Sequence, residues 1–137
     1  MIYAVIDTNV LVSALLSRHR DAATVQVFSA ISKSGFCPLY NNDILEEYKD
    51  VLSRPKFSFP PQAIVSILNA IQEIGILSDR IISQEYFPDS KDVVFYEVAL
   101  SKEGAYLVTG NTKHFPKKPI VVTPAEMMEI LKREGIV

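Results

Sequence analysis

The amino-acid sequence predicts an α/β fold in which helices cover both faces of a central parallel sheet. Short apolar runs of strand length alternate with longer segments whose apolar residues recur at helical spacing. The first run, IYAVI at residues 2–6, is apolar throughout, which is typical of a strand covered on both faces. Asp7 follows it directly, and sheets of this type bind ligands at the carboxyl ends of their strands. Right-handed crossovers would join the strands.

The first half of the chain predicts two strands and three helices. We expect a strand at 2–6, helices at 9–17 and 21–34, a strand at 36–40 and a helix at 44–52. Asp21 is a suitable N-cap for the second helix, and Gly35 is suitable just after its end. Asn and Asp side chains at 41–43 can cap the third helix, and Pro55 ends it.

The second half predicts three more strands and three more helices. We expect a helix between Pro60 and Gly75, a strand at 76–82, a loop, a helix at 92–102, strands at 105–109 and 120–122, and a helix at 123–135. The helix after Pro60 has isoleucine and leucine at helical spacing. Thr123 and Glu126 have the spacing of a capping box at the start of the last helix.

Composition limits the classes of function. The 137 residues fit one domain, residues 1–137, with a substantial core. The net charge of −2 provides no overall positive field, so any contact with nucleic acid must be local. Cys37 is the only cysteine, which excludes an internal disulfide and a cysteine-based zinc site. No export signal or membrane-spanning run is visible, so we expect a cytoplasmic protein with no membrane contact.

Asp7 needs a partner, because burying an ionised carboxylate is unfavourable unless it is paired or coordinated. One candidate lies on the helix at 44–52. Successive residues advance about 100° around a helix axis, which turns Glu46 toward water and puts Glu47 at the border of the apolar stripe. Of these two adjacent glutamates, only Glu47 can therefore point toward a cleft at the strand ends.

Further polar residues are expected at the same edge of the sheet. Asp92 begins a largely apolar helix, where it could serve a site or cap the helix, and Asp89 lies one turn earlier, where capping is the simpler interpretation. Thr109 and Asn111 follow the strand at 105–109. Carboxylates brought together in this way repel one another unless a cation bridges them, and oxygen ligands favour Mg²⁺ or Mn²⁺. Asp7, Glu47, Asp92 and Asn111 therefore predict metal-assisted phosphodiester hydrolysis.

The sequence resembles the PIN-domain nucleases, specifically the toxins of bacterial and archaeal toxin–antitoxin pairs. Four segments carry the resemblance, in the order and approximate spacing of the family: VIDTNVLVSAL, ILEEYKDVLSRPKF, DSKDVVFYEVAL and AYLVTGNTKHF. The resemblance implies a three-layer α/β/α sandwich, a Mg²⁺ or Mn²⁺ site and cleavage of single-stranded RNA. It identifies Asp7, Glu47 and Asp92 with the first three acids of the family and Asn9 with the residue that supports the first acid.

The chain departs from the family near Thr109, where many members have a fourth acid. Asn111 can offer a carbonyl oxygen there but no charge, so we expect one firmly held metal ion rather than two. His114 could donate a proton or contact phosphate, although a structural role beside Phe115 and Pro116 is the favoured interpretation.

Cations for an RNA backbone are expected on loops at the same edge. The candidates are Lys91, Lys113, Lys117 and Lys118. Residues 18–20 (RHR) could form a second patch, although solvated loop charges are the commoner explanation for these three. The resemblance further implies a homodimer and a cognate antitoxin protein as a partner.

Two other functions deserve comparison with an RNA-cleaving toxin. The Asn111 departure would also fit a weak or inactive PIN domain that binds RNA or a partner protein without cutting. Phosphotransfer on an aspartate fits poorly, because dehalogenase-like phosphatases have a second Asp two residues after the nucleophile, where this chain has Asn9, and receiver domains have their acceptor after the third strand.

Overall fold

The computed structural model describes residues 1–136, in which five strands and six α-helices alternate as expected, with three short 3-10 turns between them. The elements are β1 (Tyr3–Ile6), α1 (Thr8–Leu16), α2 (Ala23–Ser32), β2 (Cys37–Tyr40), α3 (Asn42–Leu52), η1 (Pro55–Phe57), α4 (Pro61–Ile74), β3 (Ile76–Leu77), η2 (Ser90–Asp92), α5 (Val93–Leu100), β4 (Tyr106–Val108), η3 (Thr112–His114), β5 (Val121–Val122) and α6 (Pro124–Arg133).

The five strands form one sheet in the order β3-β2-β1-β4-β5, and every neighbouring pair is parallel. β1 lies in the middle, so its residues are buried from Ala4 to Ile6. The register aligns Ile6 with Val108. Because parallel strands end at the same edge, the residues that follow β1 and β4 are neighbours. The predicted parallel sheet is confirmed.

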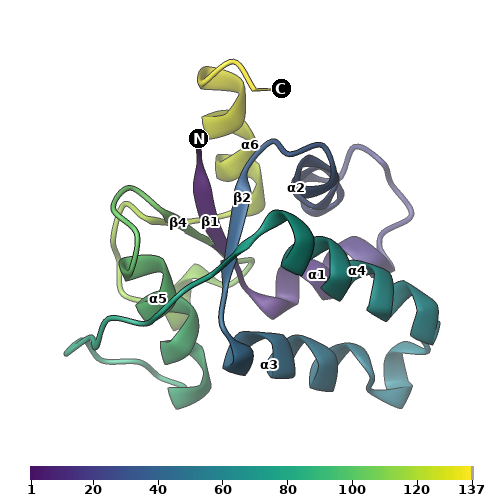
Figure 1. Ribbon diagram of the computed structural model, residues 1–137, viewed down its shortest axis with the longest axis horizontal. Helices are drawn as coiled ribbons and strands as arrows, with labels where there is room; N and C mark the ends of the chain where they lie inside the picture. The colour runs from purple at the N-terminus through teal and green to yellow at the C-terminus, as the bar shows by residue number, and fades with distance from the viewer. Residues whose placement is uncertain (137) are drawn as a thin grey trace.

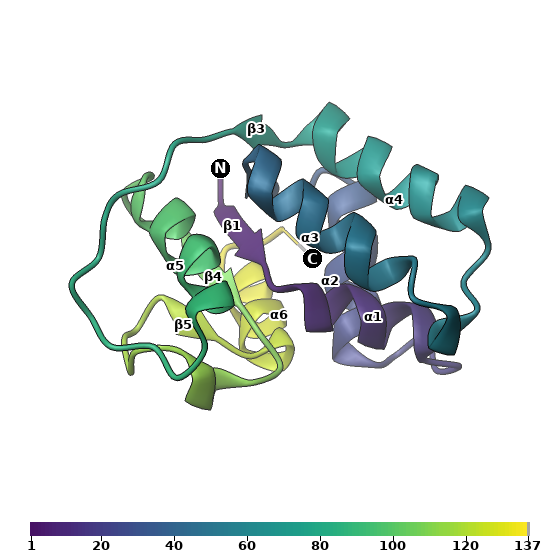
Figure 2. The ribbon, with the colours of Figure 1, turned by 90° about the horizontal axis from the view of Figure 1, so that it is seen from below.

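Helices cover both faces of this sheet. The chain moves outward from β1 through β2 to β3, and then returns to the other side of β1 to form β4 and β5. Right-handed crossovers made in opposite directions lie on opposite faces of a sheet. Accordingly, α5 lies on one side of β1, and α1, α2 and α4 lie on the other (Figures 1 and 2). The three-layer α/β/α arrangement predicted from the sequence is confirmed.

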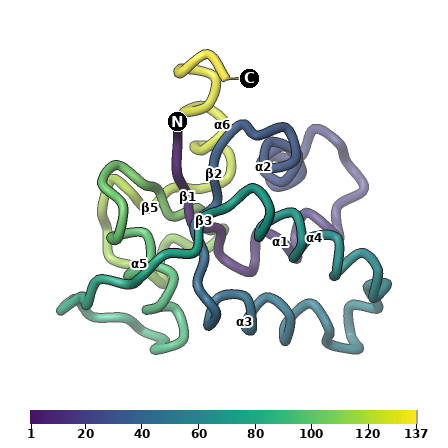
Figure 3. Tube along the Cα trace, in the orientation of Figure 1, coloured from purple at the N-terminus to yellow at the C-terminus, as the bar shows by residue number. Residues whose placement is uncertain are grey.

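The two ends of the strands face different surroundings. β1 begins and α6 ends on the same side of the molecule, whereas α3 lies on the opposite side, where the strands finish (Figures 1 and 3). The acidic residues of interest therefore gather on the α3 side. None of the helices within residues 1–136 is long and apolar enough to cross a membrane.

Several expected caps are present. Asn41 accepts a 2.8 Å hydrogen bond from the backbone N–H of Ile44 at the start of α3. Thr123 and Glu126 form the reciprocal capping box of α6, with hydrogen bonds of 3.1 and 2.9 Å. These motifs are confirmed because their donors and acceptors lie within one helical turn of each other.

The boundaries of α2 differ from the prediction at both ends. Ala22 occupies the N-cap position and provides no capping side chain, so Asp21 does not cap the helix. At the other end Ser34, with φ of 58°, has the left-handed conformation expected of Gly35. The N–H of Gly35 instead donates a 2.7 Å bond to the carbonyl of Ala30, closing the turn. A Cβ on Gly35 would lie 3.1 Å from that carbonyl oxygen, which explains glycine there.

The predicted strand at 76–82 is wrong beyond Leu77. The N–H of Ser78 donates to the carbonyl of Tyr40 at 2.7 Å, and the chain then leaves the sheet. The residues after Leu77 pack against α5 instead. The side chain of Glu97 on α5 accepts hydrogen bonds from Arg80 Nε at 2.8 Å and from the N–H of Ser83 at 2.6 Å. A buried carboxylate satisfied in this way outweighs the β propensity of the isoleucines.

Candidate active site

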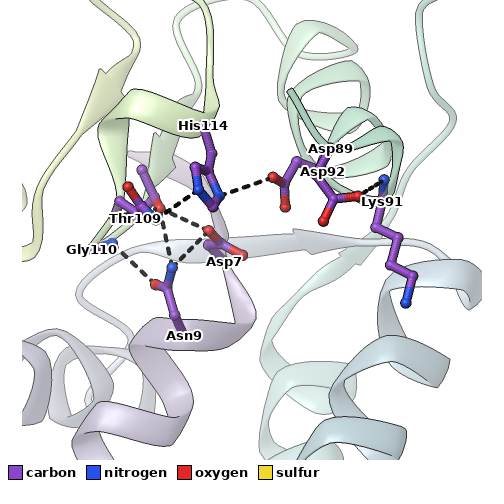
Figure 4. A network of polar contacts seen from close by, with 9 residues as sticks. Asp7, Asn9, Asp89, Lys91, Asp92, Thr109, Gly110 and His114 are labelled. Atoms are coloured by element: carbon purple, nitrogen blue, oxygen red, sulfur yellow. Dashed lines mark hydrogen bonds and ion pairs between the residues drawn. The ribbon is translucent and has the colours of Figure 1, made fainter. Parts of the chain in front are cut away.

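Asp7 lies at the carboxyl end of β1 and is only 6% exposed. Its side chain accepts hydrogen bonds from Thr109 Oγ1 at 2.7 Å and from Asn9 Nδ2 at 3.1 Å. Both donors approach the same oxygen, Oδ2, as Figure 4 shows. The other oxygen, Oδ1, receives neither of these donors. Both of these hydrogen-bond donors are neutral.

Asn9 and Thr109 connect the ends of β1 and β4. Asn9 Oδ1 accepts a 3.0 Å hydrogen bond from the N–H of Gly110, and Thr109 Oγ1 accepts one of 3.0 Å from the N–H of Asn111. The supporting position predicted for Asn9 thus has a physical basis, because both the nitrogen and the oxygen of its side-chain amide have a hydrogen-bond partner at this edge of the sheet.

The neutral partners do not compensate fully for the burial of Asp7. Burial raises the pKa of Asp7 from 3.8 to about 6; the Thr109 hydrogen bond opposes this, and repulsion from Asp92 adds to it. Asp7 is therefore close enough to Asp92 for their charges to interact. A carboxylate with a raised pKa that faces a second carboxylate is typical of a functional site.

Asp92 ends η2 and precedes α5, but its side chain caps no backbone N–H of that helix. Asp89 has the capping role, since its Oδ1 accepts a 2.9 Å hydrogen bond from the N–H of Lys91. Among the described residues, the buried Oδ2 of Asp92 has no hydrogen bond of good geometry. Burial, followed by repulsion from Asp89, raises the pKa of Asp92. Of these two aspartates, Asp92 is thus the one facing Asp7.

His114 belongs to this cluster, contrary to the structural role favoured from the sequence. Its Nδ1 lies 3.3 Å from Asp92 Oδ2, and its Nε2 lies 3.0 Å from the side-chain amide of Asn111. Its side chain is 48% exposed, which is unusual for a packing residue. Figure 4 shows the imidazole beside Asp7 and Asp92. The sequence did contain one indication that His114 lies at the site. His114 follows Asn111 by three positions, and one 3-10 turn places such residues on the same side.

Glu47 approaches from α3 on the side expected from helical geometry. Glu46 is exposed, Glu47 is half-buried, and the charge of Glu47 contributes to the raised pKa of Asp92. The next residue, Tyr48, is buried and donates a 2.5 Å hydrogen bond to the carbonyl of Ile6. This bond ties α3 to the end of β1, so the helix is held beside the site.

The three predicted carboxylates are not drawn together into one metal-binding group. Within residues 1–136, no three His, Cys, Asp or Glu side chains are grouped closely enough to hold a metal ion. Asp7 and Asp92 nevertheless supply oxygen donors of the kind that Mg²⁺ and Mn²⁺ prefer, and Asp92 Oδ2 is buried without a good donor. The donor chemistry of these two residues suits a divalent cation, and Glu47, whose charge also acts on Asp92, is a candidate third ligand.

Cations lie next to the acidic residues in the chain. Lys91 and Lys113 are exposed on η2 and η3, and Lys113 and Lys117 line a cavity of about 780 Å³ beside β5. Lys118 also lines it, but forms a 3.3 Å ion pair with Glu85. The loop after β4 therefore presents positive charge directly beyond the acidic site.

Comparisons with known proteins identify the family of the chain. The family model described as a PIN domain matches residues 3–113, a span that includes Asp7, Glu47, Asp92 and Asn111. Neither the curated proteins nor the solved structures contain a match to the chain.

Proposed function

Because this chain belongs to the PIN-domain family, we propose that it is a Mg²⁺- or Mn²⁺-dependent endoribonuclease that hydrolyses phosphodiester bonds of single-stranded RNA. PIN domains have a nuclease-type fold in general. The metal dependence is inferred from the residues at the strand ends, and the single-stranded RNA substrate is inferred from the family resemblance.

The observation that carries the proposal is the pair formed by Asp7 and Asp92. The two residues come from separate elements of the fold. Burial raises the pKa of both carboxyl groups, and repulsion from Asp92 raises the pKa of Asp7 further. Two facing carboxylates without a cation between them are unfavourable, and a structural role would be served better by neutral side chains. Such a pair is therefore best explained by the binding of a cation.

The surrounding residues have distinct roles in this proposal. Asp7 and Asp92 would hold the cation, with Glu47 as a third ligand and the Asn111 carbonyl as a neutral fourth. When bound, a divalent ion supplies Lewis acidity and lowers the pKa of water, as phosphodiester hydrolysis requires. Thr109 and Asn9 orient the Asp7 carboxylate through the hydrogen bonds to Oδ2.

His114 and the lysines would act on the substrate. An imidazole can hold and release a proton near neutral pH, and His114 lies against Asp92 with nearly half of its side chain exposed. Lys91 and Lys113 are exposed and would attract the phosphates of an RNA strand toward an otherwise acidic site. Because the net charge of the protein is negative, binding should depend on these local cations.

A second candidate is a PIN domain that binds RNA or a partner protein with little or no cleavage. The specific observation in its favour is that the described residues contain no grouped set of three metal-binding side chains. Asn111 in place of an acid acts in the same direction, since it lowers the charge available to a cation.

One experiment separates the two candidates. Purified full-length protein is incubated with a fluorescent pool of single-stranded RNA in Mn²⁺, Mg²⁺ or EDTA, and Asp7→Asn, Asp92→Asn and Glu47→Gln are compared with the matched control Glu46→Gln. We expect cleavage only with metal, its loss in both aspartate variants, a reduced rate in Glu47→Gln and an unchanged rate in Glu46→Gln. Cleavage in EDTA, or equal cleavage by all variants, would refute the metal-dependent site. Binding without cleavage by the wild type would favour the second candidate.

We also propose that the protein is the toxin of a toxin–antitoxin pair and forms a homodimer. These two inferences rest on the family resemblance, and both can be measured. Induced expression in a bacterial host should arrest growth for the wild type but not for Asp7→Asn, and sedimentation should give twice the chain mass. If cells expressing an active nuclease grow normally, the toxin role is contradicted, while the nuclease proposal is unaffected.

A further inference from the structure

A second cavity opens beside the acidic site, between α1 and the end of α3. It has a volume of about 510 Å³, and Thr8 and Asn9 form the end nearest the carboxylates. Asn9 also donates to Asp7 Oδ2, so the cavity and the acidic site share this residue. A strand of nucleic acid bound at Asp7 could therefore extend to this opening.

The walls of the cavity are largely apolar, with hydroxyl groups among them. Val12 and Leu16 from α1 face Val51 and Phe57 from α3 and η1, and Ser13 lies between them. Leu16 is 54% exposed although it is a large apolar residue. Apolar walls with a few hydroxyls match a nucleobase, which has apolar faces and a polar edge.

Thr8 supplies an independent observation. It is 6% exposed, it lines the cavity, and its hydroxyl has no hydrogen-bond partner among the described residues. A buried hydroxyl without a partner is unfavourable, by about 1–3 kcal/mol. The hydroxyl oxygen itself is buried, so a polar base edge entering the cavity would become its partner after rotation of the Thr8 side chain.

Cations flank the cavity where the phosphates of a strand would lie. Lys56 Nζ lies 5.1 Å from the centroid of the Phe57 ring, and no ion pair involving Lys56 is present in residues 1–136. Residues 18–20 (RHR) are exposed just beyond the far end of α1. An apolar cavity bordered by positive charge on a net-negative chain favours a polyanion with apolar groups over an acidic peptide or a second copy of the chain.

We propose that this cavity, which we name the base pocket, binds one unpaired nucleobase of the RNA strand whose backbone crosses Asp7. The inference rests on the proposed function and adds a reason for selecting single strands, because a base paired within a duplex cannot enter the pocket. The nine residues of α1 span about 13 Å at roughly 1.5 Å per residue, so the bound base lies within a few nucleotides of the cleaved bond.

The test uses a set of RNA oligonucleotides that differ only in the position of a single abasic nucleotide. For the wild type, removal of one particular base near the cleaved bond should slow cleavage by about 5-fold, the lower end of the range for a base–aromatic contact, because the Phe57 ring already stacks on Phe59. Phe57→Ala and Leu16→Ala should be nearly insensitive to that position. Val65→Ala is the matched control, since Val65 is 55% exposed and lies on α4, outside the pocket, and should behave as the wild type.

A binding measurement in EDTA keeps the inference testable if no cleavage occurs. Fluorescence anisotropy compares a labelled ten-nucleotide RNA with an oligonucleotide of equal length and charge whose central bases are removed. Tighter binding of the intact RNA by the wild type and Val65→Ala, but not by the pocket variants, supports the base pocket even when the nuclease proposal has failed. The base pocket is overturned if the wild type binds both oligonucleotides with equal affinity. It is also overturned if the pocket variants lose the same amount of affinity for both oligonucleotides.

Discussion

The hydroxyl of Thr109 donates a 2.7 Å hydrogen bond to Oδ2 of Asp7, joining two residues that are 102 positions apart in the chain. The contact exists because β1 and β4 are neighbours in register, with Ile6 opposite Val108. The orientation of the Asp7 side chain therefore depends on β4, a strand that lies far from Asp7 in the sequence.

Thr109→Val should reduce activity more than it reduces stability. Valine keeps the shape of threonine but cannot donate, so the pKa of Asp7, which this hydrogen bond lowers, should rise further. Loss of such a supporting partner reduces metal affinity or activity by about 10- to 100-fold. Metal titrations followed by cleavage rates measure this effect. Thr109→Ser retains the donor and should stay near the wild-type rate; an equal loss in the serine variant would show that packing is responsible.

Asp7→Asn should stabilise the protein at neutral pH. The pKa of Asp7 is about 6 in the folded protein against an ordinary value of 3.8, so the folded state holds the proton more tightly and its stability falls as the pH rises from about 4 to 6. Above pH 6 the full penalty applies, up to about 3 kcal/mol. Urea denaturation at pH 7.5 and pH 4 should therefore give a gain for Asp7→Asn at the higher pH that vanishes at the lower. A gain of equal size at both values would rule out the buried charge as its source.

Stabilisation of the protein by a bound metal ion should increase with pH, whereas its stability without metal should decrease. Mn²⁺ should raise the melting temperature of the wild type, and the increase should be larger at pH 7.5 than at pH 5, because Asp7 must lose its proton to bind a cation. Asp7→Asn and Asp92→Asn should be unaffected. Added NaCl of equal ionic strength controls for screening. A melting temperature that responds equally in wild type and variants would place the metal elsewhere.

Arg80→Met should be destabilising through Glu97 rather than through the site. Glu97 is 3% exposed and loses its charged partner in this variant. Loss of a fully buried partner is unfavourable by about 3–5 kcal/mol, and the effect here should be smaller because Arg80 is 37% exposed and Ser83 still donates to Glu97. Arg54→Met is the matched control, since Arg54 pairs with the exposed Asp50 one helical turn away and should change stability by less than about 0.5 kcal/mol. Denaturant titration compares the two. Similar losses in both variants would show that Glu97 is held by its other partners.

Local patterns in the chain were enough for those features whose causes lie within a few residues. The caps at Asn41 and Thr123 involve neighbours three residues away, and the directions of Glu46 and Glu47 follow from helical periodicity alone. The apolar run at residues 2–6 identified the central strand, and so placed Asp7 at the carboxyl end of that strand.

Features that depend on contacts between distant residues could not be read in this way. The strand expected at 76–82 ends at Leu77 because Glu97 attracts the following residues. His114 meets Asp92 only because the loop after β4 folds back over the strand ends. The spacing of the three acids likewise reflects where α3 and α5 pack, since sequence periodicity determines the direction of a side chain and only packing determines its distance from another element.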